Sequence, residues 1–394
     1  MFSVKFPTAQ SASLVSIFSK MPSRTKRTYL LFGRFAGRSG RTGRLMRPRY
    51  ETTCCPLKLP ARGTSALRQI PSHSGLHGKT GAEVEKSDVL CFAGYMRKPA
   101  KTFKIGGDLE VNRLGFGAMR LTGKGIWGEP KDVDEAKRLL KRAVELGVNF
   151  IDTADSYGPA VSERLIGEAL SPFPRGLVVA TKGGLTRQGP DRWLPVGRPE
   201  YLARQVEMSL RFLKTKVIDL WQLHRIDPKV PVEESLGVIA KLQQEGKIRH
   251  VGLSEVKPAE IERARKVIKI VSVQNLYNAR ARQHEDVLDY CEKAGLAFIP
   301  WSPVAAGKLT RPGGRLHAIA KRHGATVAQL SIAWLLHRSP IMLPIPGTSS
   351  IAHLEENLKA AEIFLSDTEL GEIESAARYR FCGLFSPGGE QQRV

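Results

Sequence analysis

The chain has 394 residues, of which 42% are hydrophobic, 25% charged and 7% aromatic. This balance is typical of a globular protein with enough apolar material for a core, and it excludes a fibrous or wholly disordered chain. No apolar run approaches the roughly 18 residues that a membrane-spanning helix requires. The cysteines are too few for a disulfide scaffold and show no metal-ligand spacing, so we expect a reducing compartment and no metal site. They are Cys54, Cys55, Cys91, Cys291 and Cys382.

The net charge of +23 is concentrated near the N-terminus. Residues 1–80 hold 15 Lys and Arg residues against one acid, Glu51, and lack sustained periodicity. Three interpretations stay open: a solvated tail, or translated sequence upstream of a true start at Met96; a cleaved targeting peptide; and a nucleic-acid-binding arm. The last lacks a binding motif and interleaved aromatic residues. We therefore predict a disordered basic extension over residues 1–98 and no nucleic-acid or membrane partner. We expect a cytoplasmic protein, or a mitochondrial or plastid one if residues 1–95 are a transit peptide.

From Phe103 onward the sequence alternates short apolar runs with amphipathic stretches, which is typical of a parallel sheet with helical crossovers. The opening FKIGGDLEVN predicts a β-hairpin around Gly106 and Gly107 that plugs the bottom of a barrel. No Gly-x-Gly-x-x-Gly turn follows any later strand, which disfavours a Rossmann fold. The sequence therefore predicts an α/β protein in which residues 99–394 form a (β/α)8 TIM barrel. The eight expected strands span 114–119, 149–154, 177–182, 217–224, 248–254, 271–277, 297–303 and 342–347.

Polar residues stand where the predicted strands end, at the rim where such barrels place their chemistry. Asp152 ends one strand and Tyr157 lies in the loop that follows. Lys182 and His224 end the next two strands. A tyrosine is a weak acid at neutral pH because its ordinary pKa is about 10. An ammonium held in place by a carboxylate would lower that pKa, so the hydroxyl could protonate a carbonyl oxygen as hydride reaches the carbon, while the imidazole orients the carbonyl.

Seven segments of the predicted barrel carry further motifs, which are GVNFIDTADSYG, VVATKGG, LWQLH, VGLS, VQNLYN, IPWSP and IPGTSSIAHLEEN. In this order they resemble the aldo/keto reductase superfamily. The resemblance implies a barrel that binds NADPH/NADP+ without a Rossmann fold and reduces an aldehyde or ketone to an alcohol. Asp152, Tyr157, Lys182 and His224 match its catalytic tetrad, with Tyr157 as general acid. The run IWGEPKDVDEA together with IPGTSS looks most similar to the bacterial and fungal pyridoxal reductase branch.

The resemblance also implies cofactor-binding positions. Ser254 and Gln274 match the side chains that grip the nicotinamide carboxamide, and Trp301 matches the aromatic on which the nicotinamide stacks. The other positions surround the pyrophosphate and the adenosine 2′-phosphate, where a helix N-terminus beginning near Ile351 would bind an anion. They are Ser302, Val304, Gly307, Gly347, Thr348, Ser349, Ser350, His353, Glu356 and Asn357. Simple capping of that helix by Ser349 or Ser350 is the structural alternative.

Two positions depart from the family pattern. Glu255 follows Ser254 where many members have asparagine, and a carboxylate can accept from the carboxamide but cannot donate to it. Gly347 and His353 stand where many members have Lys and Arg, so we expect a preference for NADPH with weaker discrimination against NADH.

Substrate choice is expected to depend on the segments 123–130, 186–198 and 378–394, with Trp127 and Trp193 as aromatic walls. Arg187, Arg192 or Arg378 could meet an anionic group, or simply lie on the surface. The expected partner is a small-molecule carbonyl substrate, and the expected state is a monomer or weak homo-oligomer. Two other functions stay open: a nicotinamide-binding regulatory subunit with little turnover, and a lyase that forms a Schiff base on Lys182.

Overall fold

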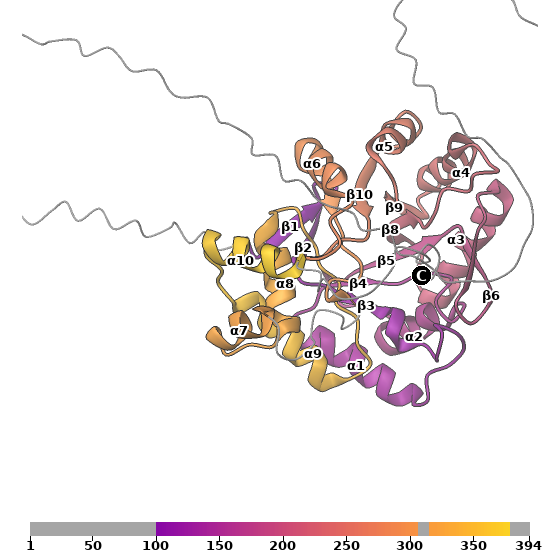
Figure 1. The fold of residues 1–394 in the computed structure, drawn as a ribbon. Coiled ribbons are helices and arrows are strands. Elements are labelled where there is room, and N and C mark those ends of the chain that lie inside the picture. The colour runs from indigo at the N-terminus through magenta and orange to yellow at the C-terminus, as the bar shows by residue number, and fades with distance from the viewer. Residues whose placement is uncertain (1–99, 306–314, 379–394) are drawn as a thin grey trace, which may run out of the picture. The chain divides into compact units, whose positions relative to one another are not determined.

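The computed structural model describes residues 100–305 and 315–378. Within them, a curled parallel sheet of seven strands has the order β3-β4-β5-β8-β9-β10-β11 (Figure 1). Successive strands of this sheet are neighbours in space and are joined by helical crossovers, as a (β/α)8 barrel requires. The strands are β3 (Phe116–Gly117), β4 (Phe150–Asp152), β5 (Val178–Gly183), β8 (Ile218–Leu223), β9 (Ile248–Ser254), β10 (Ile270–Gln274) and β11 (Ala297–Phe298).

The segment 342–347 closes the barrel between β11 and β3. The Leu343 N–H donates to the Phe298 carbonyl over 2.8 Å, and the Gly115 N–H donates to the Pro344 carbonyl over 3.0 Å. The segment forms no regular strand, contrary to prediction, because Pro344 and a second proline two residues later have no N–H to donate to β3. It nevertheless occupies the eighth position, so the predicted (β/α)8 barrel is confirmed.

A β-hairpin plugs the bottom of the barrel, as predicted. Strands β1 (Thr102–Ile105) and β2 (Leu109–Asn112) pair antiparallel, and their inward residues join a buried apolar cluster with residues of the barrel strands. In the turn, Asp108 contacts the imidazole Nε2 of His250 on β9 at 2.6 Å. Gly106 has a φ of +68°, and a Cβ there would lie only 2.5 Å from the same imidazole. The hairpin therefore requires glycine at this position.

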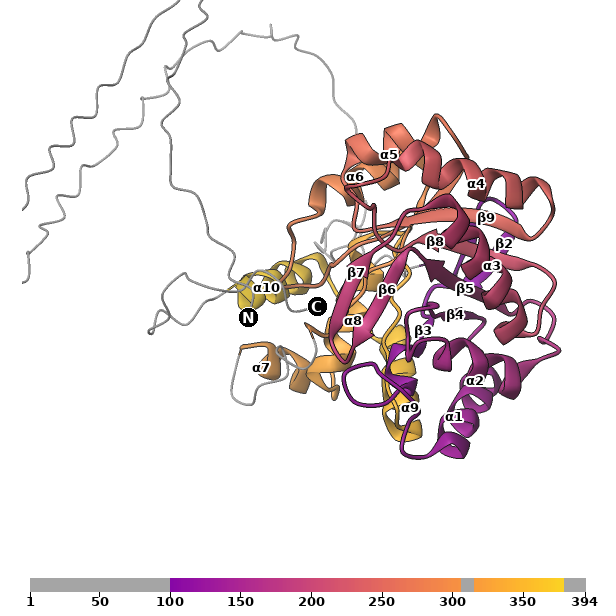
Figure 2. The same ribbon diagram turned by 90° about the vertical axis from the view of Figure 1, so that its right-hand side faces the viewer.

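Helices surround the outside of the sheet (Figures 1 and 2). In α1 (Val133–Glu145) the Asp132 side chain caps the first turn by accepting from the Glu135 N–H over 2.7 Å, and Leu139 and Leu140 are buried. None of the described helices is both long and apolar enough to span a membrane. The others are α2 (Val161–Leu170), α3 (Pro199–Leu213), α4 (Val232–Gln244), α5 (Pro258–Arg265), α6 (Glu285–Ala294), α7 (Arg315–Arg322), α8 (Val327–Arg338), α9 (Ile351–Leu358) and α10 (Asp367–Arg378), with the 3-10 turns η1 (Ala118–Leu121) and η3 (Lys359–Glu362).

A second hairpin follows β5 where the sequence predicted only a loop. Strands β6 (Leu185–Gly189) and β7 (Arg192–Pro195) pair antiparallel, with Arg187 opposite Trp193 (Figure 2). Two residues of the turn adopt positive φ, namely Gly189 at 145° and Asp191 at 53°. Glycine and aspartate tolerate this conformation, so the residue types between the two strands could have predicted a turn here.

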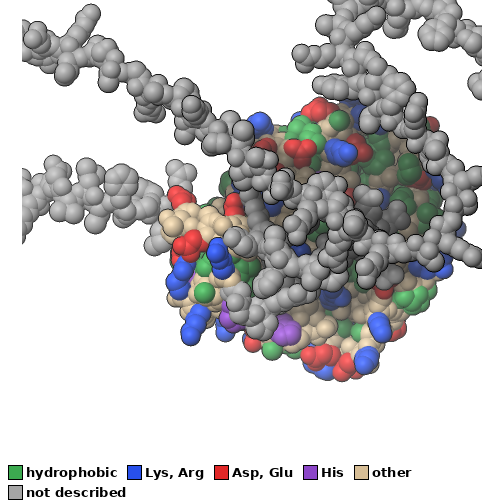
Figure 3. Space-filling view, viewed as in Figure 1, with side chains coloured by type: hydrophobic (Ala, Val, Ile, Leu, Met, Phe, Trp, Pro, Cys, Tyr) green, Lys and Arg blue, Asp and Glu red, His purple; other side chains and the backbone are tan. Residues whose placement is uncertain are grey.

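Two predicted features lie outside the described residues. They are the basic extension over residues 1–98 and the C-terminal segment beyond residue 378. Where the described surface is visible in Figure 3, acidic and basic side chains are interspersed.

Candidate active site

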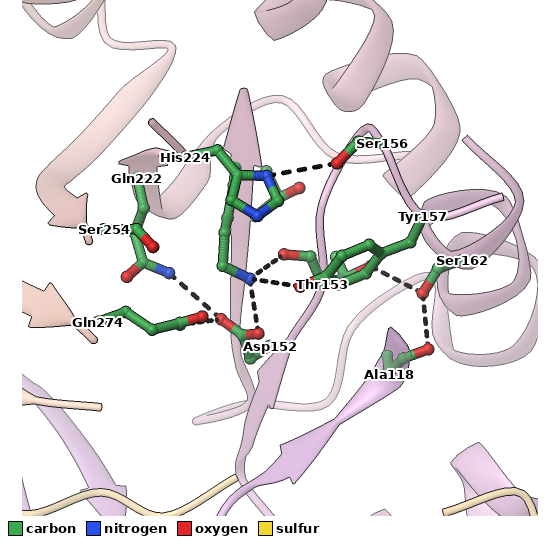
Figure 4. Close-up of polar contacts among 12 residues, drawn as sticks. Ala118, Asp152, Thr153, Ser156, Tyr157, Ser162, Gln222, His224, Ser254 and Gln274 are labelled. Atoms are coloured by element: carbon green, nitrogen blue, oxygen red, sulfur yellow. Dashed lines mark hydrogen bonds and ion pairs between the residues drawn. The ribbon is translucent and has the colours of Figure 1, made fainter. Parts of the chain in front are cut away.

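The four predicted tetrad residues converge at the carboxyl ends of β4, β5 and β8 (Figure 4). The Lys182 ammonium lies at the centre. It donates to Asp152 Oδ2 over 2.6 Å and to the Thr153 carbonyl over 2.8 Å, and lies 3.4 Å from the Tyr157 hydroxyl. Tyr157, His224 and Asp152 are buried, and Lys182 is fully inaccessible. The structure thus brings together side chains that lie as far as 72 positions apart in the sequence.

The Asp152 carboxylate is held from three sides. Lys182 donates to Oδ2, while the amide nitrogens of Gln222 and Gln274 donate to Oδ1 over 3.2 and 2.8 Å. A buried ion pair is stable only when its remaining hydrogen-bonding positions are satisfied, and the two amides provide this. The sequence analysis missed Gln222, although a glutamine two residues before His224, between the apolar Trp221 and Leu223, was a usable signal.

Burial and charge act in opposite directions on Lys182 and Tyr157. Burial would lower the pKa of Lys182, but the adjacent Asp152 carboxylate and Tyr157 raise it, and the net shift is upward. Burial raises the pKa of Tyr157, and the Lys182 ammonium opposes that shift without reversing it. The expectation of a lowered tyrosine pKa is therefore wrong for this structure, because desolvation of a buried phenolate outweighs one ammonium. The phenol is protonated at neutral pH, which is the form a proton donor needs.

His224 is uncharged at neutral pH. Burial, followed by the charges of Lys182 and Arg225, lowers its pKa well below the ordinary value. Its Nδ1 lies 3.3 Å from the Ser156 hydroxyl. Either atom can be the donor in this contact, so it orients the imidazole without fixing which ring nitrogen carries the proton. The sequence analysis missed Ser156, which precedes Tyr157 directly.

The Trp193 indole borders the tetrad, with its ring centroid 6.5 Å from those of both Tyr157 and His224. The Arg187 guanidinium lies 3.6 Å from the Trp193 ring centroid and 5.6 Å from that of Trp127. Its N–H groups donate to four backbone carbonyls, those of Gly125, Ile126, Ser156 and Gly189. Arg187 therefore connects the loops around the aromatic rings, while its buried Nε–H has no hydrogen-bond partner among the described atoms. Arg192 is exposed on β7, and the Arg378 side chain lies outside the described part of the chain.

The predicted nicotinamide residues lie beside the tetrad. Ser254 ends β9 and Gln274 ends β10, and both stand near Asp152 in Figure 4. The Ser254 hydroxyl accepts from Arg225 over 3.2 Å and keeps its own proton to donate. The amide nitrogen of Gln274 donates to Asp152 over 2.8 Å, so its Oε1 is the atom that could accept from a ligand. One hydroxyl donor and one amide acceptor are the complement of a carboxamide group.

Glu255 does not have the surroundings that the sequence analysis expected. Its Oε1 accepts from the Trp301 indole N–H over 2.7 Å and from the Leu276 backbone N–H over 2.6 Å. Its backbone φ of +55° lies in the left-handed region. The carboxylate therefore supports the ring of Trp301 from its edge.

The residues predicted around the phosphates gather at the first turn of α9. The Ser350 hydroxyl caps this helix by accepting from the His353 N–H over 3.5 Å, and the Thr348 hydroxyl accepts from the Ser350 N–H over 3.1 Å. Ser349 and His353 are exposed. Capping, foreseen as the structural alternative, therefore occurs, and hydroxyls and helix N–H groups stand together as an anion site requires.

The remaining predicted cofactor positions differ in whether their polar groups already have hydrogen-bond partners. The Glu356 carboxylate accepts from the Thr326 hydroxyl over 2.7 Å, so part of its capacity is already used, while Asn357 is half-buried on the same helix. The Ser302 carbonyl accepts from Asn278, and Val304 packs against a small apolar cluster that includes Leu336. Gly307 lies outside the described residues.

A buried acid that the sequence analysis missed lies behind Lys182. The Glu163 carboxylate accepts from the Thr181 hydroxyl over 2.5 Å, and burial raises its pKa to about 7. Burial, followed by the charge of Glu163, raises the pKa of the neighbouring Asp155 well above the ordinary value, and the Ser156 N–H and hydroxyl oppose this shift. These acids are therefore protonated more readily than exposed carboxyl groups are.

The fold and the site together define a (β/α)8 barrel with a buried lysine–aspartate pair beside a tyrosine at its carboxyl rim. The model of the aldo/keto reductase family matches residues 113–378, and the chain belongs to that family. It is 55% identical over 285 residues to an uncharacterized oxidoreductase of Schizosaccharomyces pombe, covering 71% of this chain and 92% of the relative. It is 41% identical over 285 residues to pyridoxine 4-dehydrogenase of Escherichia coli, covering 71% and 99%. A solved aldo-keto reductase from Klebsiella pneumoniae in complex with NADPH superimposes with a TM-score of 0.62 at 27% identity, covering 71% and 96%.

Proposed function

We propose that this protein is an NADPH-dependent reductase that converts an aldehyde or ketone to an alcohol, with Tyr157 as the proton donor. The carbonyl carbon gains a hydride, its oxygen gains the Tyr157 proton, and one alcohol and one NADP+ result. The observation that carries the proposal is the Lys182 ammonium, which lies between the Asp152 carboxylate at 2.6 Å and the Tyr157 hydroxyl at 3.4 Å.

The described residues fit an NADP cofactor, which supplies the hydride when bound. Ser254 would donate to the carboxamide and Gln274 would accept from it, because its amide nitrogen is already engaged by Asp152. Trp301 would lie against the nicotinamide ring. The hydroxyls of Thr348 and Ser349 and the first N–H groups of α9 would hold the 2′-phosphate, without a lysine or arginine from the predicted positions.

The tetrad residues would divide the work of proton transfer. Tyr157 is protonated at neutral pH and would give its proton to the carbonyl oxygen. Lys182 would stabilise the resulting phenolate, and Asp152 keeps the lysine in place and charged. His224 is neutral, and in the tautomer with its proton on Nε2 it would donate a second hydrogen bond to orient the carbonyl.

The substrate that fits best is an aldehyde on a flat ring, as in pyridoxal. The Trp193 ring lies next to Tyr157 and nearly perpendicular to it, and the Arg187 guanidinium lies over the Trp193 ring and stabilises its position. The name of the 41% identical Escherichia coli relative, pyridoxine 4-dehydrogenase, points to the same substrate class. We place the catalytic unit in residues 99–394.

The test compares the full-length protein with Tyr157→Phe. We expect NADPH to bind both proteins with similar affinity, measured by fluorescence titration, and we expect only the wild type to consume NADPH with pyridoxal or 4-nitrobenzaldehyde. Loss of a general acid typically costs about 10² to 10⁴ in rate. Tyr290→Phe, on the outer surface, is the matched control. Tight binding without turnover on any carbonyl would favour a regulatory subunit, and absence of NADPH binding would overturn the cofactor site.

A further inference from the structure

Glu255 contacts the ring that the proposed function places against the nicotinamide. One carboxylate oxygen accepts from both the Trp301 indole N–H and the Leu276 backbone N–H, over 2.7 and 2.6 Å. Leu276 and Trp301 are themselves paired as neighbouring residues of parallel segments. The carboxylate therefore joins the edge of the indole to the end of the sheet and favours this orientation of the ring.

The backbone at Glu255 is in a conformation that glutamate does not favour. Its φ of +55° lies in the left-handed region, where a non-glycine residue costs about 1 kcal/mol and asparagine is tolerated best. The shorter side chain of asparagine would not reach as far as that of Glu255. The two hydrogen bonds offset the backbone cost, so the longer acidic side chain has a specific role in this chain.

Glu255 carries a negative charge at neutral pH. Burial would raise its pKa, but the nearby His284 imidazole, the hydrogen bonds from Trp301 and the Leu276 N–H, and the charge of Arg225 lower it below the ordinary value. His284 Nε2 lies 3.7 Å from the other carboxylate oxygen. These partners stabilise the carboxylate as an anion, and they leave one full charge whose removal can be measured.

We propose that Glu255 biases the bound cofactor toward its oxidised form. This inference rests on the proposed function, because it requires the nicotinamide to lie against Trp301. The nicotinamide ring is neutral in NADPH and carries one positive charge in NADP+, since a hydride takes both bonding electrons with it. An indole whose N–H donates to a carboxylate has a more electron-rich face, and the carboxylate adds its own attraction for a cation.

The bias has two consequences for the reaction. Carbonyl reduction becomes more favourable on the enzyme, because the oxidised cofactor that it produces is stabilised relative to the reduced one. Release of NADP+ becomes slower for the same reason, and release of product cofactor is often the step that limits turnover.

The experiment measures the dissociation constants of the full-length protein for NADP+ and NADPH by calorimetry. Glu255→Gln removes the charge and keeps an acceptor for both donors. We expect its Kd for NADP+ to rise roughly three- to tenfold while its Kd for NADPH changes less than about twofold. A tenfold change in the ratio corresponds to about 30 mV in the reduction potential of the bound couple.

Two further variants keep the test decisive. Glu255→Asn is suited to the left-handed backbone and is also neutral, so it should show the same selective loss of NADP+ affinity. Glu262→Gln makes the same chemical change on the exposed side of α5 and should leave the ratio unchanged. Equal weakening of both nucleotides, or no change, in the Glu255 variants would overturn the proposal. Absence of binding of either nucleotide to the wild type would instead overturn the proposed function.

Discussion

The floor and the rim of the barrel are built from the same strands but have opposite chemistry. Inward positions near the amino ends of β4, β5 and β8 belong to the apolar cluster that packs on the β1–β2 hairpin. Inward positions two residues later carry the hydrogen-bonded network around Lys182. The floor positions are Phe150, Ala180 and Leu220, and the rim positions are Asp152, Lys182 and Gln222.

The position of an inward residue along its strand therefore determines whether its side chain packs in the apolar core or belongs to the polar site. Every second residue of a strand points the same way, so each pair above shares one column. The floor is closed by the hairpin and gains stability from burial. The rim lies beneath loops that bring polar partners, so a lysine and an aspartate are tolerated there when they satisfy each other. Floor substitutions should therefore change stability, and rim substitutions should change activity.

The largest expected effect is at the rim. Lys182→Met should lower kcat/KM by about 10³-fold, or about 4 kcal/mol, because the phenolate of Tyr157 loses its neighbouring cation. NADPH consumption assays with the cofactor dissociation constant measured in parallel would test this. Lys247→Met, which removes a lysine from surface ion pairs with Glu207 and Glu245, is the control and should keep full activity. Normal turnover in Lys182→Met would mean that the chemistry occurs elsewhere.

A floor substitution should lower the stability of the protein and leave its activity nearly unchanged. Ile105→Ala removes a fully buried side chain of the hairpin and should lower the free energy of unfolding by about 3 kcal/mol. The value of kcat per folded molecule should stay within about twofold of the wild type. Urea denaturation and the activity assay measure the two quantities, and the exposed Val217→Ala serves as the stability control. A large loss of kcat would show that floor and rim are coupled.

Glu163 allows a test of how a buried ionised carboxylate close to the rim changes the free energy of unfolding. Its pKa is raised to about 7 from an ordinary value of 4.5, so the folded state holds the proton more tightly than the unfolded state. Its contribution to stability is complete below about pH 4.5 and is lost as the pH rises through about 7. Glu163→Gln should therefore be more stable than the wild type above pH 7, by about 3 kcal/mol for a pKa shift of this size, and show little difference at pH 4.5. A difference that does not depend on pH would contradict the raised pKa.

The smallest expected effect concerns the orientation of His224. Ser156→Ala removes the hydroxyl that lies 3.3 Å from Nδ1 and should lower kcat/KM about fivefold, the value of one ordinary hydrogen bond. The affinity for NADPH should not change. Ser331→Ala, which removes a hydroxyl bonded within α8, is the matched control. An unchanged kcat/KM in Ser156→Ala would remove Ser156 from the set of positioning residues.

Much of the fold was predictable from local patterns, and the exceptions have identifiable causes. The predicted strand over 248–254 coincides with β9 (Ile248–Ser254), and the helix expected near Ile351 begins there. The segment 342–347 failed as a strand because its prolines remove N–H donors, a signal that was visible in the sequence. The hairpin β6–β7 was missed because its strands are short and half-exposed. Their sequences therefore lack a clear alternation of apolar and polar residues.

The (β/α)8 barrel, its plug and the residue types at the strand ends could be predicted from the sequence alone, because periodicity and turn residues act over short distances along the chain. The sequence also predicted that Asp152, Tyr157, Lys182 and His224 would meet at one rim, since parallel strands end on the same side. Three properties depend on tertiary packing. They are the direction of the Tyr157 pKa shift, the carbonyl groups to which Arg187 donates, and the ring that Glu255 contacts. These depend on burial and on distances between residues far apart in the chain, and a sequence pattern contains neither.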